Sequence, residues 1–101
     1  MKKYIILIPI YNDRESLTKL IEDINSEIEG INSEISIIVI NDASSQQIID
    51  EYQNIENINS IEIINMRENK GHARCIASGL KYIFEKKEFD YVIPMLSLIH
   101  I

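Results

Sequence analysis

Residues 3–10 read KYIILIPI and lead directly into Tyr11, Asn12 and Asp13. The run from 3 to 10 is apolar and rich in isoleucine, which is typical of a strand buried on both faces, as in a parallel sheet. The polar triplet ends the strand, and Asn12 or Asp13 suits the cap position of a following helix. This stretch therefore predicts a buried parallel strand followed by a helix.

A helix and a second buried strand are expected next. Between residues 15 and 29 the apolar residues recur at helical spacing in one stripe, and Gly30 is a natural stop. Residues 34–40 (EISIIVI) repeat the isoleucine-rich pattern and predict a second strand, which ends at a polar turn. Residues 46–53 predict a short helix. The two apolar stripes comprise Leu17, Leu20, Ile21, Ile24 and Ile28 in the first helix, and Ile48, Ile49 and Tyr52 in the second.

The second half of the chain continues the alternation. Residues 60–65 (SIEIIN) predict a strand at a sheet edge, residues 71–86 a third helix, and residues 90–95 (DYVIPM) the start of a fourth strand. The order β-α-β-α-β-α-β implies right-handed crossovers, so we predict an α/β fold with a Rossmann-like parallel sheet and helices on both faces. The inward residues expected of the third helix are Ala73, Ile76, Ala77, Leu80, Ile83 and Phe84.

Composition and charge exclude several classes of protein. The 101 residues suffice for one small domain, and 46% hydrophobic residues indicate a globular chain. The net charge of −6 argues against a nucleic-acid partner, because binding phosphates needs a basic stripe. Cys75 is the only cysteine, so no internal disulfide forms and a reducing, cytoplasmic compartment is expected. The amino-terminal apolar run contains Pro9 and is too short for a signal peptide, and no stretch is long enough to span a membrane.

Polar clusters follow three of the predicted strands, at residues 11–13, 41–45 and 68–71. In open α/β sheets the ligand lies at the carboxyl ends of the strands, so a small polar ligand is expected there. A tyrosine such as Tyr11 stacks on a base, and Asp42 accepts hydrogen bonds from a base edge or ribose. The turn before Gly71 opens a helix, whose free N–H groups attract phosphate, and Lys70 and Arg74 add positive charge. These features point to a nucleotide.

Three motifs carry a resemblance to a known family. ILIPIYND (6–13) looks like the first-strand signature of family 2 glycosyltransferases, IIVINDASS (37–45) is similar to their second signature, and NKGHARCIASGL (69–80) resembles their third. The motifs lie in the family's order and near its usual spacing, although Ala43 stands where the family usually has glycine. The resemblance implies the GT-A fold, of which this chain would be the amino-terminal, nucleotide-binding half.

The resemblance also implies roles for six residues. Pro9 and Tyr11 would line the base and ribose pocket, and Asp13 would hold the nucleotide side. Asp42 would hydrogen-bond the base, while Gly71 and Arg74 would lie along the ribose and diphosphate. The pair Gly71-His72 is reminiscent of the branch that loads sugars onto polyprenyl phosphate.

The parent enzyme implied by the resemblance transfers a sugar from a UDP- or GDP-linked donor, with inversion, to a glycan or polyprenyl phosphate. Such enzymes hold Mg²⁺ or Mn²⁺ on an Asp-x-Asp motif after the fourth strand. Here residues 96–101 read LSLIHI instead. This tail matches the translation of a sequencing-library transposon adapter, so we expect a domain of residues 1–95 interrupted in its fourth strand, and a non-native tail at 96–101. The chain then lacks catalytic and metal-binding residues, and we expect it to be inactive.

Structural alternatives stand beside these readings. Asp13 and Asp42 also suit helix caps, Arg74 a surface ion pair, and Cys75 a place in the core. A non-catalytic nucleotide-binding or interaction module is the alternative function. A receiver-like module is disfavoured, because residues 64–66 carry no acidic side chain. An interrupted sheet would also leave an apolar surface uncovered.

Overall fold

The computed structural model describes residues 1–10, 14–42, 55–66 and 71–95. In chain order the elements are β1 (Lys2–Ile10), α1 (Arg14–Glu27), β2 (Ser33–Asn41), β3 (Ser60–Asn65), α2 (Gly71–Lys86) and β4 (Tyr91–Pro94). The four predicted strands and the first and third predicted helices are confirmed; two of these elements have the predicted boundaries, and the other four differ by no more than two residues at either end. The short helix predicted at 46–53 lies outside the described residues.

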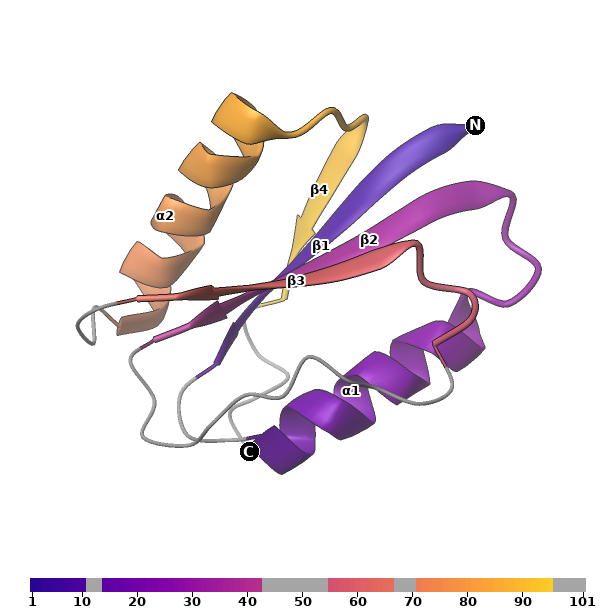
Figure 1. Ribbon diagram of the computed structural model, residues 1–101, viewed down its shortest axis with the longest axis horizontal. Coiled ribbons are helices and arrows are strands. Elements are labelled where there is room, and N and C mark those ends of the chain that lie inside the picture. Colours follow the sequence, from indigo (N-terminus) through magenta and orange to yellow (C-terminus); the bar gives the residue numbers. More distant parts are fainter. Residues whose placement is uncertain (11–13, 43–54, 67–70, 96–101) are drawn as a thin grey trace.

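The four strands form one parallel sheet in the order β3-β2-β1-β4. The two isoleucine-rich strands, β1 and β2, are central, and the less apolar β3 lies at an edge, as its pattern predicted. Helix α1 covers one face of the sheet and α2 the other (Figure 1). The predicted α/β, Rossmann-like class is therefore confirmed.

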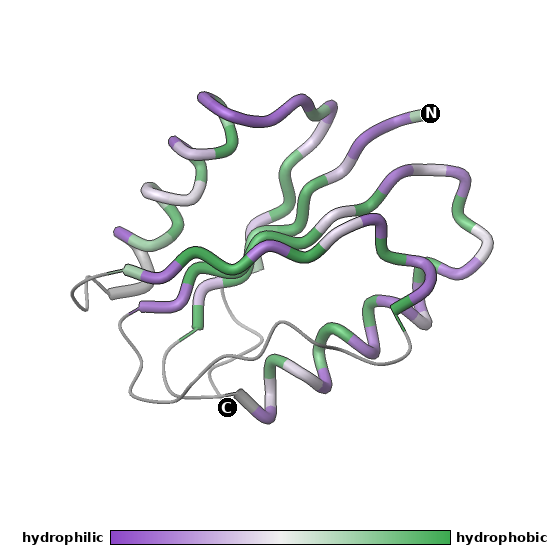
Figure 2. The backbone as a smooth tube through the Cα atoms, in the orientation of Figure 1, coloured by the Kyte–Doolittle hydropathy of each residue, from purple (hydrophilic) through white to green (hydrophobic). Residues whose placement is uncertain are grey.

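Alternate residues of the central strands supply two separate cores. In β1, Ile6, Ile8 and Ile10 pack under α1, whereas Ile5 and Leu7 pack under α2. Because successive side chains of a strand point to opposite faces, a strand covered on both faces must be apolar at every position. Figure 2 shows this hydrophobic colouring along the middle of the sheet.

The buried face of α2 matches the predicted one in part. Of the expected inward residues, Ile83 is buried and Ile76 and Leu80 pack against the same core, whereas Ala77 and Phe84 are exposed, Phe84 by 68%. Cys75 lies in the core as expected, and Gly79, which was not predicted to face inward, is buried as well; the burial of Ala73 lies outside the described residues. Phe84 packs instead edge-on against Phe89, with ring centroids 5.2 Å apart.

Gly79 marks the closest approach of α2 to the sheet. A Cβ atom at this position would lie 2.7 Å from Leu7 Cδ1 and 3.2 Å from Ile40 Cγ1. The first separation is shorter than real carbon contacts, so Leu7 or the helix would have to shift, and the second is tighter than an ordinary van der Waals contact. Only glycine therefore lets α2 sit at this depth.

A pair of asparagines ties α1 to the segment before β3. The Oδ1 atom of buried Asn25 accepts a hydrogen bond from the backbone N–H of Asn57 at 2.7 Å, and Asn57 Nδ2 donates to the carbonyl of Asn25 at 2.9 Å. These bonds satisfy a buried amide that the sequence patterns did not single out.

The outer edge of the sheet at β4 is apolar and open. Tyr91 is 51% exposed although it stacks on Tyr4, and Ile93 is 44% exposed. A hollow of about 290 Å³ with a mostly apolar lining opens beside Ile93 and Ile31. In the part of the chain that the structure describes, the expected uncovered apolar surface is therefore found at this edge.

Candidate functional site

The ends of three strands meet at one edge of the sheet. Ile10 of β1 pairs with Asn41 of β2, which pairs with Asn65 of β3. The pairing continues one residue further, because the N–H of Asp42 donates to the carbonyl of Ile10 and the N–H of Met66 to that of Asn41, both at 2.8 Å. The strand ends that precede the predicted polar clusters therefore lie side by side at this edge.

Helix α2 begins at the same edge. In Figure 1 the first turn of α2 lies beside the ends of β2 and β3, and the helix then runs back over the sheet. Cys75 on its second turn belongs to the same core cluster as Ile38 and Ile40 of β2, and the negative charge of nearby Asp42 acts on its thiol. The amino terminus of a helix and a buried carboxylate are thus neighbours.

Asp42 is held inside the protein at this edge. Asp42 is 1% exposed, and Cys75 is fully buried. The pleat of β2 explains the contact, since Ile38, Ile40 and Asp42 alternate onto the α2 face. Burial, followed by the hydrogen bond to Asp42 and its negative charge, raises the pKa of the Cys75 thiol to about 12. The thiol is therefore a protonated donor at neutral pH and not a nucleophile.

The other face of the same edge carries a side-chain pair that sequence reasoning missed. Asn41 Nδ2 donates to Asn65 Oδ1 at 2.9 Å, and Asn41 is buried. Asparagine as the last residue of each of two neighbouring parallel strands is the sequence signal that could have found it. The pair links β2 to β3 where both strands end.

The predicted site residues fall into three groups. Pro9 and Asp42 are fully buried at the ends of β1 and β2, so a ligand reaches them only past the residues that cover them. Gly71 begins α2, and Arg74 is exposed on its first turn. Tyr11 and Asp13 lie outside the described residues. The described members of the predicted set thus lie on elements that meet at this edge.

The described residues do not form a metal centre. Among them, no three His, Cys, Asp or Glu side chains gather into a group that would hold an ion. Among the described residues at this edge, Asp42 is the one buried carboxylate. A single carboxylate does not supply the set of oxygen ligands that Mg²⁺ or Mn²⁺, the divalent cation implied by the resemblance, requires. Neither α1 nor α2, the helices in the described ranges, has the length and hydrophobicity of a membrane-crossing segment.

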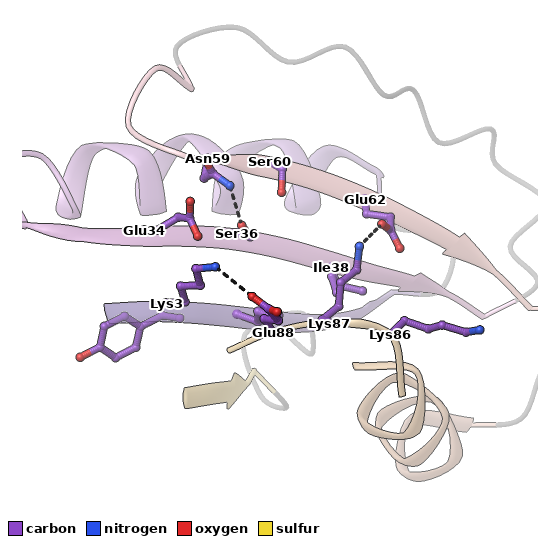
Figure 3. A pocket seen from close by; sticks show the side chains of 12 residues that line it. Lys3, Glu34, Ser36, Ile38, Asn59, Ser60, Glu62, Lys86, Lys87 and Glu88 are labelled. Atoms are coloured by element: carbon purple, nitrogen blue, oxygen red, sulfur yellow. Dashed lines mark hydrogen bonds and ion pairs between the residues drawn. The ribbon is translucent and has the colours of Figure 1, made fainter. Parts of the chain in front are cut away.

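A polar hollow lies at the opposite end of the sheet. It has a volume of about 340 Å³ and two ion pairs, Lys3 with Glu88 at 3.5 Å and Lys87 with Glu62 at 2.9 Å (Figure 3). Burial raises the pKa of the Glu62 carboxyl, but the hydrogen bonds from Tyr82 and Lys87 and the charge of Lys87 outweigh burial and hold this pKa below its ordinary value. Because its charges balance one another, this hollow does not select an ion of either sign.

Comparison with known proteins gives a family. The sequence model described as Glycosyl transferase family 2 matches residues 5–95, a range that includes all the described helices and most of the sheet. Dolichol-phosphate mannosyltransferase from Pyrococcus furiosus is 29% identical to this chain over 79 residues. That match covers 78% of this chain but only 22% of the relative, so the chain spans about a fifth of the relative's length. No solved structure matches the chain.

Proposed function

Since this chain belongs to glycosyl transferase family 2, we propose that it forms the nucleotide-binding half of an enzyme that transfers a sugar from a nucleoside diphosphate donor, with inversion. The parallel sheet with a helix on each face is consistent with the amino-terminal half of a GT-A fold. The acceptor half would then belong to the rest of the parent protein.

The observation that carries the proposal is the position of Asp42. This aspartate follows a central strand, lies buried at the carboxyl edge of the sheet and is close enough to Cys75 on α2 for its charge to act on the thiol. A carboxylate at that place accepts N–H or O–H groups from a base or ribose, while the amino terminus of α2 favours the negative diphosphate. The sugar donor of a glycosyltransferase carries a base, a ribose and a diphosphate in one molecule. This single edge of the sheet could therefore bind both the nucleoside and the diphosphate of the donor.

Each residue predicted for the site has a role in this proposal. Asp42 would accept a hydrogen bond from the base, and Gly71 and Arg74 would lie along the ribose and diphosphate. At the end of β1, Pro9 and Tyr11 would line the base and ribose pocket, with the Tyr11 ring stacked on the base, and Asp13 would hold the nucleotide side.

For the donor we propose a UDP- or GDP-linked sugar, and for the acceptor a polyprenyl phosphate. The name of the similar mannosyltransferase and the pair Gly71-His72 support this acceptor over a glycan. In the parent enzyme Mg²⁺ or Mn²⁺ would neutralise the leaving diphosphate on ligands from outside the described residues. We propose that the reaction takes place in the cytoplasm or at the cytoplasmic face of a membrane.

Calorimetric titration of this chain with UDP and with GDP tests the proposal. We expect weak binding of one nucleotide that does not change with manganese. Asp42→Ala should weaken it at least about tenfold, because a hydrogen bond to a charged group contributes about 1.5–3 kcal/mol. Asp42→Asn, which keeps the shape of the side chain, provides a second variant if the alanine variant unfolds.

Asp23→Ala is the matched control, since Asp23 is an exposed aspartate on α1. It should bind as the wild type does. If the folded wild type binds neither nucleotide, or if the Asp42 variants bind as tightly as the control, the proposed site is wrong.

A further inference from the structure

Two asparagines at the carboxyl edge of the sheet form an anchored pair. Asn41 is the last residue of β2 and Asn65 the last of β3, and the register of the two parallel strands sets them side by side. Nδ2 of Asn41 donates a hydrogen bond to Oδ1 of Asn65 at 2.9 Å. Asn41 is 6% exposed, whereas Asn65 is an exposed residue. The buried member of the pair therefore holds the exposed member in place.

This hydrogen bond decides which end of the Asn65 amide is offered at the edge. An asparagine amide has an acceptor oxygen and a donor NH₂ group, and the oxygen of Asn65 accepts from Asn41. In the part of the chain that the structure describes, Nδ2 of Asn65 has no protein partner. Asn65 therefore offers a hydrogen-bond donor whose orientation is set before any ligand binds.

Asn65 lies beside the strand end that leads to Asp42. Asp42 follows Asn41 directly, and the N–H of Met66 donates to the carbonyl of Asn41 at 2.8 Å. Because side chains alternate along a strand, Asn41 and Asp42 lie on opposite faces of the sheet, and Asn65 lies on the face of Asn41. A base that lies across the end of β2 would have the carboxylate of Asp42 on one side and the amide of Asn65 on the other.

We infer that Asn65 selects the base of the nucleotide, and that Asn41 is the residue that positions it: the NH₂ group of Asn65 donates to a keto oxygen of the base. This inference rests on the proposed function for the presence of a nucleotide at this edge. Uracil and guanine carry the keto oxygens O4 and O6 where cytosine and adenine carry amino groups. A contact that offers only a donor favours the keto bases, because an amino group would face it with a second donor.

Calorimetric titration with two pairs of nucleotides measures this selection. The pairs are UDP with CDP and GDP with ADP, and the charge of the diphosphate cancels from the ratio of affinities within a pair. We expect the wild type to bind the keto member of at least one pair about three- to tenfold more tightly, the fold-change of one net hydrogen bond.

Asn65→Asp is the decisive variant, because it changes an exposed side chain without changing its shape. It keeps an oxygen to which Asn41 donates and replaces the NH₂ group with a second oxygen. It should reverse the preference, since a carboxylate accepts from the amino group of cytosine or adenine. Asn59→Asp is the matched control at the other end of the strand, where Nδ2 of exposed Asn59 donates to Ser36 Oγ at 3.3 Å. It adds the same charge and should keep the wild-type preference.

Asn41→Ala tests the positioning role separately. Without its anchor the amide of Asn65 turns over and offers either its oxygen or its NH₂ group to the base. The preference for the keto base should therefore fall below about twofold although Asn65 is unchanged. Circular dichroism confirms that each variant is folded, and Asn65→Asp decides alone if Asn41→Ala unfolds.

The outcomes separate this inference from the proposed function. A wild type that binds UDP or GDP but prefers neither member of a pair overturns the selection by Asn65 and leaves the proposed function standing. A preference that is unchanged in Asn65→Asp, or that Asn59→Asp alters equally, does the same. A full preference in folded Asn41→Ala overturns the positioning role of Asn41. If the wild type binds none of the four nucleotides, the proposed function fails, and the inference fails with it.

Discussion

Replacing Gly79 with alanine adds one methyl group where α2 lies closest to the sheet. The new Cβ would lie 2.7 Å and 2.9 Å from the two Cδ atoms of Leu7, and 3.2 Å from Ile40 Cγ1. Leu7 is fully buried between the sheet and α2, so its side chain has no open space to move into. Either Leu7 must adopt a strained rotamer or α2 must move outward.

Two opposing terms determine the size of the effect. Alanine is favoured over glycine in a helix interior by about 1 kcal/mol. Overpacking a well-packed core costs about 1–3 kcal/mol. The packing term is expected to exceed the helix-propensity term at this contact, because all three separations fall well below van der Waals distance. We therefore expect Gly79→Ala to lower the free energy of unfolding by about 1 kcal/mol.

Urea unfolding followed by far-ultraviolet circular dichroism measures this change. Ser78→Ala is the control, because Ser78 is exposed on the same helix and its replacement should raise stability slightly through helix propensity. If Gly79→Ala stabilises the protein as much as the control does, α2 does not sit at the depth described here. Combining it with Leu7→Ala should reverse its sign, since the added methyl group then fills part of a cavity.

Three further changes test other parts of the structure. Asn25→Ala should lower the free energy of unfolding by about 1–3 kcal/mol, because it leaves the backbone N–H of Asn57 without its 2.7 Å acceptor; a loss below about 0.5 kcal/mol in urea unfolding would contradict this. The pKa of Glu62 is lowered from 4.5, so its ionised form stabilises the fold above pH 4.5, and this contribution disappears as the pH falls through the folded-state pKa. The Glu62→Gln variant should therefore lose stability less steeply than the wild type as the pH falls from about 5. An identical dependence of stability on acidic pH in both proteins would refute the shift. The open apolar edge at β4 predicts that the 101-residue chain self-associates. Ile93→Lys places a charge on this edge and should reduce self-association in sedimentation equilibrium, whereas Phe84→Lys on α2 should not. Equal effects of the two substitutions would show that the chain does not associate through the β4 edge.

The strands and their order in the chain were readable from the sequence. Runs such as 5–10 and 37–40 are apolar at every position, and only a strand covered on both faces needs that pattern. The alternation of these runs with amphipathic segments predicts right-handed crossovers and a parallel sheet. The parallel pairing of all four strands of the sheet β3-β2-β1-β4 confirms the parallel sheet. The polar residues after the strands also predicted which edge of the sheet would carry a site.

The buried face of α2 was not readable in the same way. Sequence patterns weigh each side chain by its own hydrophobicity, so they favoured Phe84 over Gly79 as an inward residue. In the structure Gly79 is buried where α2 lies closest to Leu7 and Ile40, and the ring of Phe84 is left exposed.

The sequence by itself thus determined the fold class and the edge at which Asp42 lies, because burial on two faces and strand direction are local properties of the chain. Only the tertiary structure decided that Asp42 and Cys75, 33 positions further along the chain, are both buried between β2 and α2 at this edge. Their proximity depends on the depth at which α2 sits on the sheet. The depth is a property of both surfaces together, set by a missing side chain at Gly79 and the position of Leu7 beneath it.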